Sequence, residues 1–154
     1  MKKLYKITPV LILLLIVTIA IIYNFYRLKP LEFPDESAFM LSLSCEDSVA
    51  VGETANITVS FFSDLKEQYE MVYFNVSFFK ITVNDEILTP QGEGTFTRRL
   101  TPGENSNSIP YTYTPSKAGT YTVKATVEFE IRLSPENTKE YRLEKSTLLE
   151  VTEH

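Results

Sequence analysis

The stretch Ile109 to Leu133, IPYTYTPSKAGTYTVKATVEFEIRL, decides the fold. From Tyr121 to Leu133 apolar side chains occupy the odd positions, and mostly polar ones occupy the even positions. A period of two is typical of a half-buried antiparallel strand. At about 3.3 Å per residue this strand could extend roughly 45 Å, which favours a central place in a sheet. The turn-forming residues 114–119 predict a tight corner between it and a shorter strand at 109–113.

Apolar residues alternate along further short strands, at 39–45, 54–61, 72–78, 79–83, 87–88, 96–100 and 141–151. Asn84-Asp85 is one of the turns between them. Phe74 and Val76 belong to the apolar row of 72–78, and the change of phase at Phe78-Phe79 predicts a bulge or a crossing between sheets. We expect 101–108, TPGENSNS, to be a surface loop, and the last strand to be bulged or near an edge. Short strands at regular spacing predict an all-β antiparallel sandwich.

The first 27 residues differ in kind from the rest. Three lysines precede an uncharged run from Thr8 to Tyr26. As a helix this run spans about 28 Å, close to the roughly 30 Å hydrocarbon core of a bilayer. Tyr23 and Tyr26 stand where an interfacial aromatic belt is expected, and Arg27 follows them. Residues 1–27 are therefore expected to form a single transmembrane signal-anchor helix in the cytoplasmic membrane, with the N-terminus on the inner side and the C-terminal domain outside.

A spacer and one globular domain are expected to follow the anchor. Residues 28–37, LKPLEFPDES, carry two prolines and three acids, which predicts an extended and stiff spacer. Residues 38–154 are expected to form the domain outside the membrane. A cleaved signal peptide is the alternative, because Thr18-Ile19-Ala20 loosely resembles a cleavage region. The apolar run continues to Tyr23, so we favour a retained anchor.

The charge of the chain is strongly uneven. Beyond residue 29 there are ten basic and twenty acidic side chains, hence a formal net charge of −10. Such a domain repels phosphate backbones and anionic headgroups, so we expect no nucleic-acid binding. Solubility explains the acid excess most simply. Cys45 is the one cysteine, so no intrachain disulfide is expected, and the surrounding alternation predicts a buried thiol.

Groups for catalysis or metal binding are scarce. The one histidine is His154, so the sequence holds no zinc or copper ligand set and no His–Cys nucleophile pair. The scattered glycines predict no phosphate-binding loop. Glu128 and Glu130 could pair for glycoside hydrolysis, but their place on the polar face of one strand favours a solvated surface. We expect no enzymatic activity, no cofactor and no metal.

The run TPSKAGTYTVKATV, residues 114–127, resembles the corner before the penultimate strand of immunoglobulin-like domains. The resemblance implies that Gly119 forms the turn, that the Tyr121 hydroxyl closes the corner and that Val123 replaces the second disulfide cysteine. Without a disulfide or a tryptophan, the chain looks most like the adhesion-related immunoglobulin-like domains of bacterial and archaeal surface proteins. The phrase VGETANITV, residues 51–59, is similar to theirs. The resemblance covers roughly 39–151 and concerns the scaffold.

Two N-glycosylation sequons lie on polar strand faces, at Asn56 and Asn75. With the anchor, the spacer and the lack of catalytic groups, they lead us to expect a membrane-anchored interaction domain. It would bind another envelope or membrane protein as an accessory or structural subunit of a surface assembly. Two alternatives stay open. One is a secreted filament or surface-lattice subunit with a cleaved signal, and the other is a carbohydrate-binding module with a groove lined by Tyr111 and Tyr113.

Overall fold

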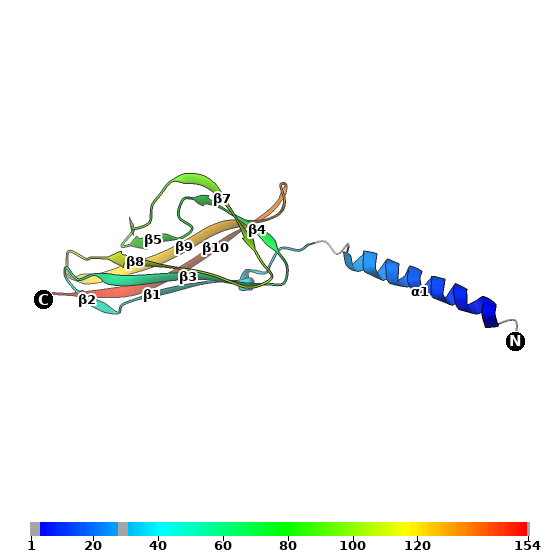
Figure 1. Ribbon diagram of the computed structural model, residues 1–154. Coiled ribbons are helices and arrows are strands. Elements are labelled where there is room, and N and C mark those ends of the chain that lie inside the picture. The colour runs from blue at the N-terminus through cyan, green and yellow to red at the C-terminus, as the bar shows by residue number, and fades with distance from the viewer. Residues whose placement is uncertain (1–3, 28–30, 154) are drawn as a thin grey trace. The chain divides into compact units, whose positions relative to one another are not determined.

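The computed structural model describes residues 4–27 and 31–153, with side chains described over 11–23 and 31–153 (Figure 1). The chain divides into two compact units, Met1–Glu32 and Phe33–His154. The first contains the helix α1 (Leu4–Arg27), and the second contains every described strand.

The helix α1 exposes apolar side chains around its circumference. From Leu11 to Tyr23 its large apolar residues are between 48% and 65% exposed. Among the described residues, no helix combines the length and the apolar character that a membrane crossing requires. The expected transmembrane span is therefore not confirmed. Tyr23 is exposed, and the side chains of Tyr26 and Arg27 lie outside the described part of the chain.

The second unit is all-β, as predicted. A short 3-10 helix, η1 (Glu36–Ala38), leads into the strands, whose bounds are β1 (Phe39–Cys45), β2 (Ser48–Ala50), β3 (Ala55–Leu65), β4 (Tyr69–Asn75), β5 (Lys80–Val83), β6 (Glu86–Ile87), β7 (Glu93–Leu100), β8 (Gly103–Tyr113), β9 (Gly119–Ser134) and β10 (Asn137–Thr152). Asn84 and Asp85 both have positive φ, at 46° and 68°, and form the predicted turn between β5 and β6.

The strands form two sheets that pack as a sandwich. The smaller has the order β1-β3-β8, and the larger has the order β2-β10-β9-β4-β7, with β5 also pairing with β9. All pairings are antiparallel except that of β2 with β10. The long strand β9 is central in its sheet, as predicted. The smaller sheet thus contains β1 and β3, and the larger one contains β4, β9 and β10. This division of the strands is typical of an immunoglobulin-like sandwich.

The core lies between the two sheets and belongs to the second unit alone. Its largest fully buried side chains include Phe61, Phe79, Ile57, Met71, Ile81, Leu100, Ile131 and Leu149. Every fully buried apolar residue of this core lies between Phe39 and Val151. Each such side chain contributes about 1.5 to 3 kcal/mol on burial. The sandwich thus carries its own core and needs no residue before Phe33 to form it.

The globular unit begins earlier than predicted, at Phe33 instead of residue 38. Pro34 is buried, and its carbonyl accepts a hydrogen bond of 2.6 Å from the Tyr141 hydroxyl. Asp35 caps η1 by accepting a bond of 2.9 Å from the Ser37 N–H. The predicted spacer 28–37 is therefore wrong for 33–37, because this buried hydrogen bond and the packing of Phe33 hold the segment on the sandwich.

The predicted loop at 101–108 is wrong, since β8 begins at Gly103 and pairs with β3 through Tyr113. Asn105 and Asn107 are half-buried, while Ser106 and Ser108 are exposed. The period of two is present, but polar residues occupy both faces and so conceal it from a search for apolar alternation.

The bulge or crossing between sheets predicted at Phe78-Phe79 is wrong, because the chain instead breaks into two separate strands, β4 and β5, that both pair with β9 in the same sheet. The last strand was expected to be bulged or near an edge, and its one register shift against β9 lies at its start, at Asn137/Thr138. β2 covers β10 only at Glu150–Thr152, so the rest of β10 borders the sheet edge, as predicted.

Candidate functional site

The break between β4 and β5 opens a groove beside the central strand β9. β4 pairs with β9 as far as Val72, opposite Glu130, and β5 resumes the pairing at Lys80, opposite Thr126. Between these contacts, residues 127–129 have no strand partner on this side within the described chain. The end of β4 turns away to pair with β7 alone. The groove that remains has a volume of about 690 Å³.

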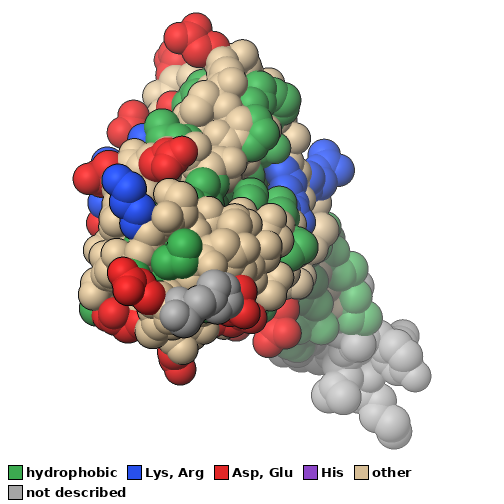
Figure 2. Space-filling model, turned by 90° about the vertical axis from the view of Figure 1, so that its left-hand side faces the viewer, with side chains coloured by type: hydrophobic (Ala, Val, Ile, Leu, Met, Phe, Trp, Pro, Cys, Tyr) green, Lys and Arg blue, Asp and Glu red, His purple; other side chains and the backbone are tan. Residues whose placement is uncertain are grey.

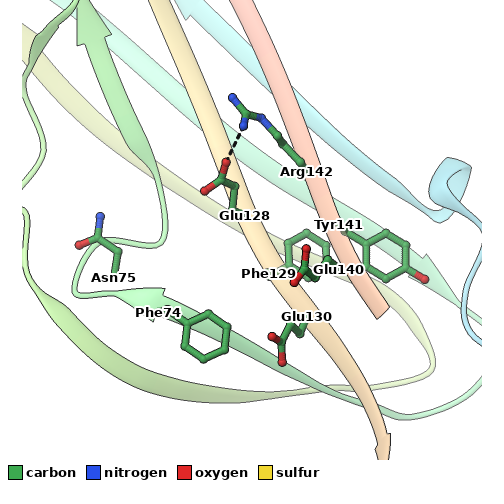
Figure 3. Close-up of a pocket in the computed structure, with 8 residues that line it drawn as sticks. All are labelled: Phe74, Asn75, Glu128, Phe129, Glu130, Glu140, Tyr141 and Arg142. Carbon is green, nitrogen blue, oxygen red and sulfur yellow. Dashed lines mark ion pairs between the residues drawn. The ribbon is translucent and has the colours of Figure 1, made fainter. Parts of the chain in front are cut away.

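Eight residues from β4, β9 and β10 line the groove (Figure 3): Phe74, Asn75, Glu128, Phe129, Glu130, Glu140, Tyr141 and Arg142. Phe129 and Tyr141 are buried, with rings stacked at 5.4 Å between centroids, and both rings pack against Phe39 in the core between the sheets. Burial raises the pKa of Tyr141 to about 12. Figure 3 shows Phe74 on the other side of the groove from Glu130.

Ion pairs fix the acidic side of the groove. Arg142 lies 2.9 Å from Glu128 and 3.4 Å from Glu144. Arg132 donates two hydrogen bonds to Glu130, at 3.2 and 3.1 Å. The two exposed pairs of Arg142 contribute at most about 1 kcal/mol each to stability. Their main effect is to orient the carboxylates along the groove.

Phe74 and Glu140 are the two residues of the groove whose side chains are exposed and available to a ligand. The Phe74 ring is 48% exposed, which leaves a large apolar surface in water. Glu140 is exposed and forms no ion pair with a described residue. An aromatic face together with a carboxylate suits the side chain of lysine or arginine. The unpaired backbone of 127–129 adds N–H and C=O groups, so the groove can take an extended basic segment.

The sequence reading found part of this site. Glu128 and Glu130 lie on the polar face of β9, as predicted, and each is paired with an arginine. Phe74 and Val76 were expected to face the core, but they are 48% and 45% exposed. That prediction is wrong because β4 ends at Asn75, so the alternation does not continue to Phe78. The change of phase in the sequence was the signal for a break, but it did not show that a groove results.

The predicted corner is present. Gly119 has φ +145°, a backbone conformation that favours glycine. The Tyr121 hydroxyl donates a hydrogen bond of 2.8 Å to the carbonyl of Lys117. Val123 is fully buried in the same core as Ile57, where the disulfide of other immunoglobulin-like domains would lie. These residues determine the fold and lie outside the groove.

The two sequons differ in access. Asn56 is exposed on β3, and its side-chain amide donates to Glu46 at 3.2 Å. Asn75 is half-buried, donates to Gln91 at 3.3 Å and accepts from the N–H of Gly92 at 3.2 Å. Asn56 is therefore the more accessible acceptor.

Tyr111 and Tyr113 lie in the inward row of β8 and are half-buried. Burial raises the pKa of both hydroxyls. The centroid of the Tyr113 ring lies 5.8 Å from that of Tyr121, so the ring packs against the corner of the domain. The carbohydrate-binding alternative thus gains no support here. Cys45 is half-buried instead of buried, and burial raises the pKa of its thiol.

Acidic side chains do not gather into a metal site. In the described parts of the chain, no three His, Cys, Asp or Glu side chains are placed to hold a metal ion. On the face shown in Figure 2, acidic side chains are scattered among uncharged ones. This distribution is typical of a solvated surface.

The sheet order and the tyrosine corner define an immunoglobulin-like β-sandwich. No protein-family model and no curated protein matches the sequence. Among solved structures it is similar to the CARDB domain of a Pyrococcus furiosus protein, determined as a crystal structure with di-metal ions and in solution. Both are 19% identical with a TM-score of 0.47, and the matches cover 79% of this chain and 90% or 97% of that domain. PapD-like domain 7 of human CEP192 is 16% identical with a TM-score of 0.39, covering 82% of this chain and 94% of that one.

Proposed function

We propose that this protein is a non-enzymatic interaction protein, whose immunoglobulin-like domain stands outside the cytoplasmic membrane and binds another envelope or membrane protein. The observation that carries the proposal is the break between β4 and β5. It places an exposed aromatic ring, a free carboxylate and an unpaired stretch of the central strand side by side.

The chemistry of the groove favours a basic partner segment. The Phe74 ring and the Glu140 carboxylate both attract a lysine or arginine side chain. The backbone of 127–129 hydrogen-bonds to the main chain of the same segment. The formal charge of −10 beyond residue 29 also attracts basic partners at long range.

The N-terminal helix supports display at a membrane. From Leu11 to Tyr23 its side chains are exposed and all but Thr18 are apolar, and a helix surface this apolar needs a bilayer or a bundle of other helices to cover it. The lysines at the start of the sequence favour an N-terminus inside. In this arrangement the protein serves as an accessory or structural subunit of a cell-surface assembly.

Site-specific photo-crosslinking in the cells that make the protein tests the groove. A crosslinking amino acid replaces Phe74 in one full-length chain and Leu148, another exposed apolar residue, in a second. We expect one adduct specific to position 74, which Glu140→Lys reduces at least fivefold. Equal adducts from both positions, or none from position 74, would contradict the proposal.

Fractionation and intact mass test the membrane arrangement separately. We expect the full chain to stay in the membrane pellet after washing at high salt, and a chain lacking 1–32 to be released. An intact mass that corresponds to a chain beginning near Ile21 would instead indicate a secreted subunit with a cleaved signal. Added mass that disappears in Asn56→Gln would identify the modified sequon.

A further inference from the structure

The smaller sheet ends in a strand whose outer edge is open. β8 pairs with β3 along all of its eleven residues, and within the described chain no strand borders its other side. β7, which precedes it, pairs with β4 of the other sheet and leaves this edge uncovered. Half of the backbone N–H and C=O groups of β8 are therefore available for pairing with another chain.

The other free edges of the sandwich carry features that prevent strand addition. β7 bears Arg98 and Arg99, and its pairing with β4 has a register shift. β2 has three residues, and the uncovered length of β10 carries basic side chains at 139, 142 and 145. β1 is shorter than β8 and lies close to β10. Natural sheets protect their edges by such charges, irregularities and short strands.

β8 lacks most of this protection. From Asn105 to Tyr113 it contains no charged residue, and Pro110 is the one residue that removes a backbone donor. Its inward row, which includes Ile109 and Tyr111, is half-buried, although the residues of β3 opposite that row are fully buried. A strand added at this edge would cover that row and satisfy the free backbone groups.

We propose that β8 pairs antiparallel with β8 of a second copy of this chain, about a two-fold axis. The two three-stranded sheets then become one sheet of six strands. Charge permits this occupant at β8, because residues 105–113 carry no charged side chain and so bring no like charges together when two chains with a formal net charge of −5 each meet there, whereas a basic partner is drawn to the acidic groove. The inference is independent of the groove, since β8 belongs to the other sheet.

The size of the contact predicts a weak dimer. A single strand pair buries well below the roughly 1,600 Å² of a standard interface. Self-association is therefore expected in concentrated solution, or where a membrane raises the local concentration.

Cysteine crosslinking of the full chain in mild detergent tests the geometry. In a Cys45→Ser background, Ser106→Cys and Ser108→Cys are oxidised separately and as a mixture. When the two eleven-residue strands overlap fully, residue 103 opposes residue 113 and Ser108 opposes its own copy, so Ser108→Cys should give most of the disulfide-linked dimer. A two-fold axis at residue 107 or 106 would instead give it in the mixture or in Ser106→Cys. Thr58→Cys, exposed on the adjacent strand β3, is the control. Equal crosslinking through Thr58→Cys would indicate face-to-face stacking and overturn the proposal.

Sedimentation of the same detergent-solubilised chain, from about 10 µM to about 500 µM, tests the energetics. Ser106→Lys places like charges across the shared edge and should weaken the dimer at least tenfold. Ser42→Lys, a matched change of an exposed serine on β1, should leave it unchanged. A monomer at every concentration, or a dimer that Ser106→Lys does not weaken, overturns the proposal.

Discussion

Replacing Tyr141 by phenylalanine should destabilise the sandwich through a single hydrogen bond. The Tyr141 hydroxyl donates to the Pro34 carbonyl at 2.6 Å, and the side chain is 4% exposed. The ring also packs against Phe39 and Phe129 at 4.8 and 5.4 Å between centroids, and phenylalanine preserves those contacts. The lost donor leaves a buried carbonyl unsatisfied, which costs about 1 to 3 kcal/mol of unfolding free energy.

The same hydroxyl predicts a pH dependence. Burial, and then the nearby groups Tyr69, Glu36 and Asp35, raise the pKa of Tyr141 to about 12, against about 10 in the unfolded chain. The fold therefore favours the neutral hydroxyl, and this stabilisation is complete below pH 10 and is lost as the pH rises through 12. By linkage about 1.4 kcal/mol is lost at pH 11 and about 2.7 kcal/mol well above pH 12.

Urea unfolding of residues 33–154 at pH 8 and pH 11 measures both effects, since this unit holds its own core. The difference between wild type and Tyr141→Phe should be about 1 to 3 kcal/mol at pH 8 and smaller by about 1.4 kcal/mol at pH 11. Tyr111→Phe is the control, because the Tyr111 hydroxyl makes no hydrogen bond among the described residues and should change stability by less than about 0.5 kcal/mol. Equal losses for the two variants at pH 8 would refute the argument.

Three further substitutions test the fold by thermal unfolding of residues 33–154. Tyr121→Phe removes the 2.8 Å bond to Lys117 and should lower stability by about 1 kcal/mol; an unchanged midpoint would argue against the corner. Gly119→Ala forces alanine to φ +145° and should cost about 1 to 3 kcal/mol, and a more stable variant would show that the turn is not strained. Leu149→Ala leaves a cavity at a fully buried position and should lower the unfolding free energy by about 2 to 5 kcal/mol. Leu148→Ala, at the neighbouring residue that is 57% exposed, should lower it by less than about 0.5 kcal/mol. Equal losses for the two variants would show that the register of β10 is wrong.

The strands that bury one full face could be predicted from the sequence. β1, β3 and β9 alternate in sequence, and burial alternates with them except at the buried Thr126, because the hydrophobic effect acts mainly on one face of each strand. The corner was predicted for a different reason. A glycine with positive φ and a tyrosine two residues later have local geometric roles that a short motif can reveal.

Features that depend on pairing between distant strands could not be predicted. The groove exists because β4 leaves β9 after Val72 to follow β7, and no local pattern specifies that choice. The strand predicted at 109–113 is the second half of β8, but its first half was missed because Asn and Ser alternate between its faces there, so that half is determined by its pairing with β3. The docking of Phe33 and Pro34 likewise depends on Tyr141, more than a hundred residues along the chain.

The affinity of the crosslinked partner for defined variants tests the central claim most directly. Phe74→Ser and Leu148→Ser both remove an exposed apolar side chain, but only the first changes the groove beside β9. Our account predicts that the partner binds Phe74→Ser at least tenfold more weakly than wild type and binds Leu148→Ser with unchanged affinity. Equal affinity for wild type and Phe74→Ser would contradict the proposal that this groove is the binding site.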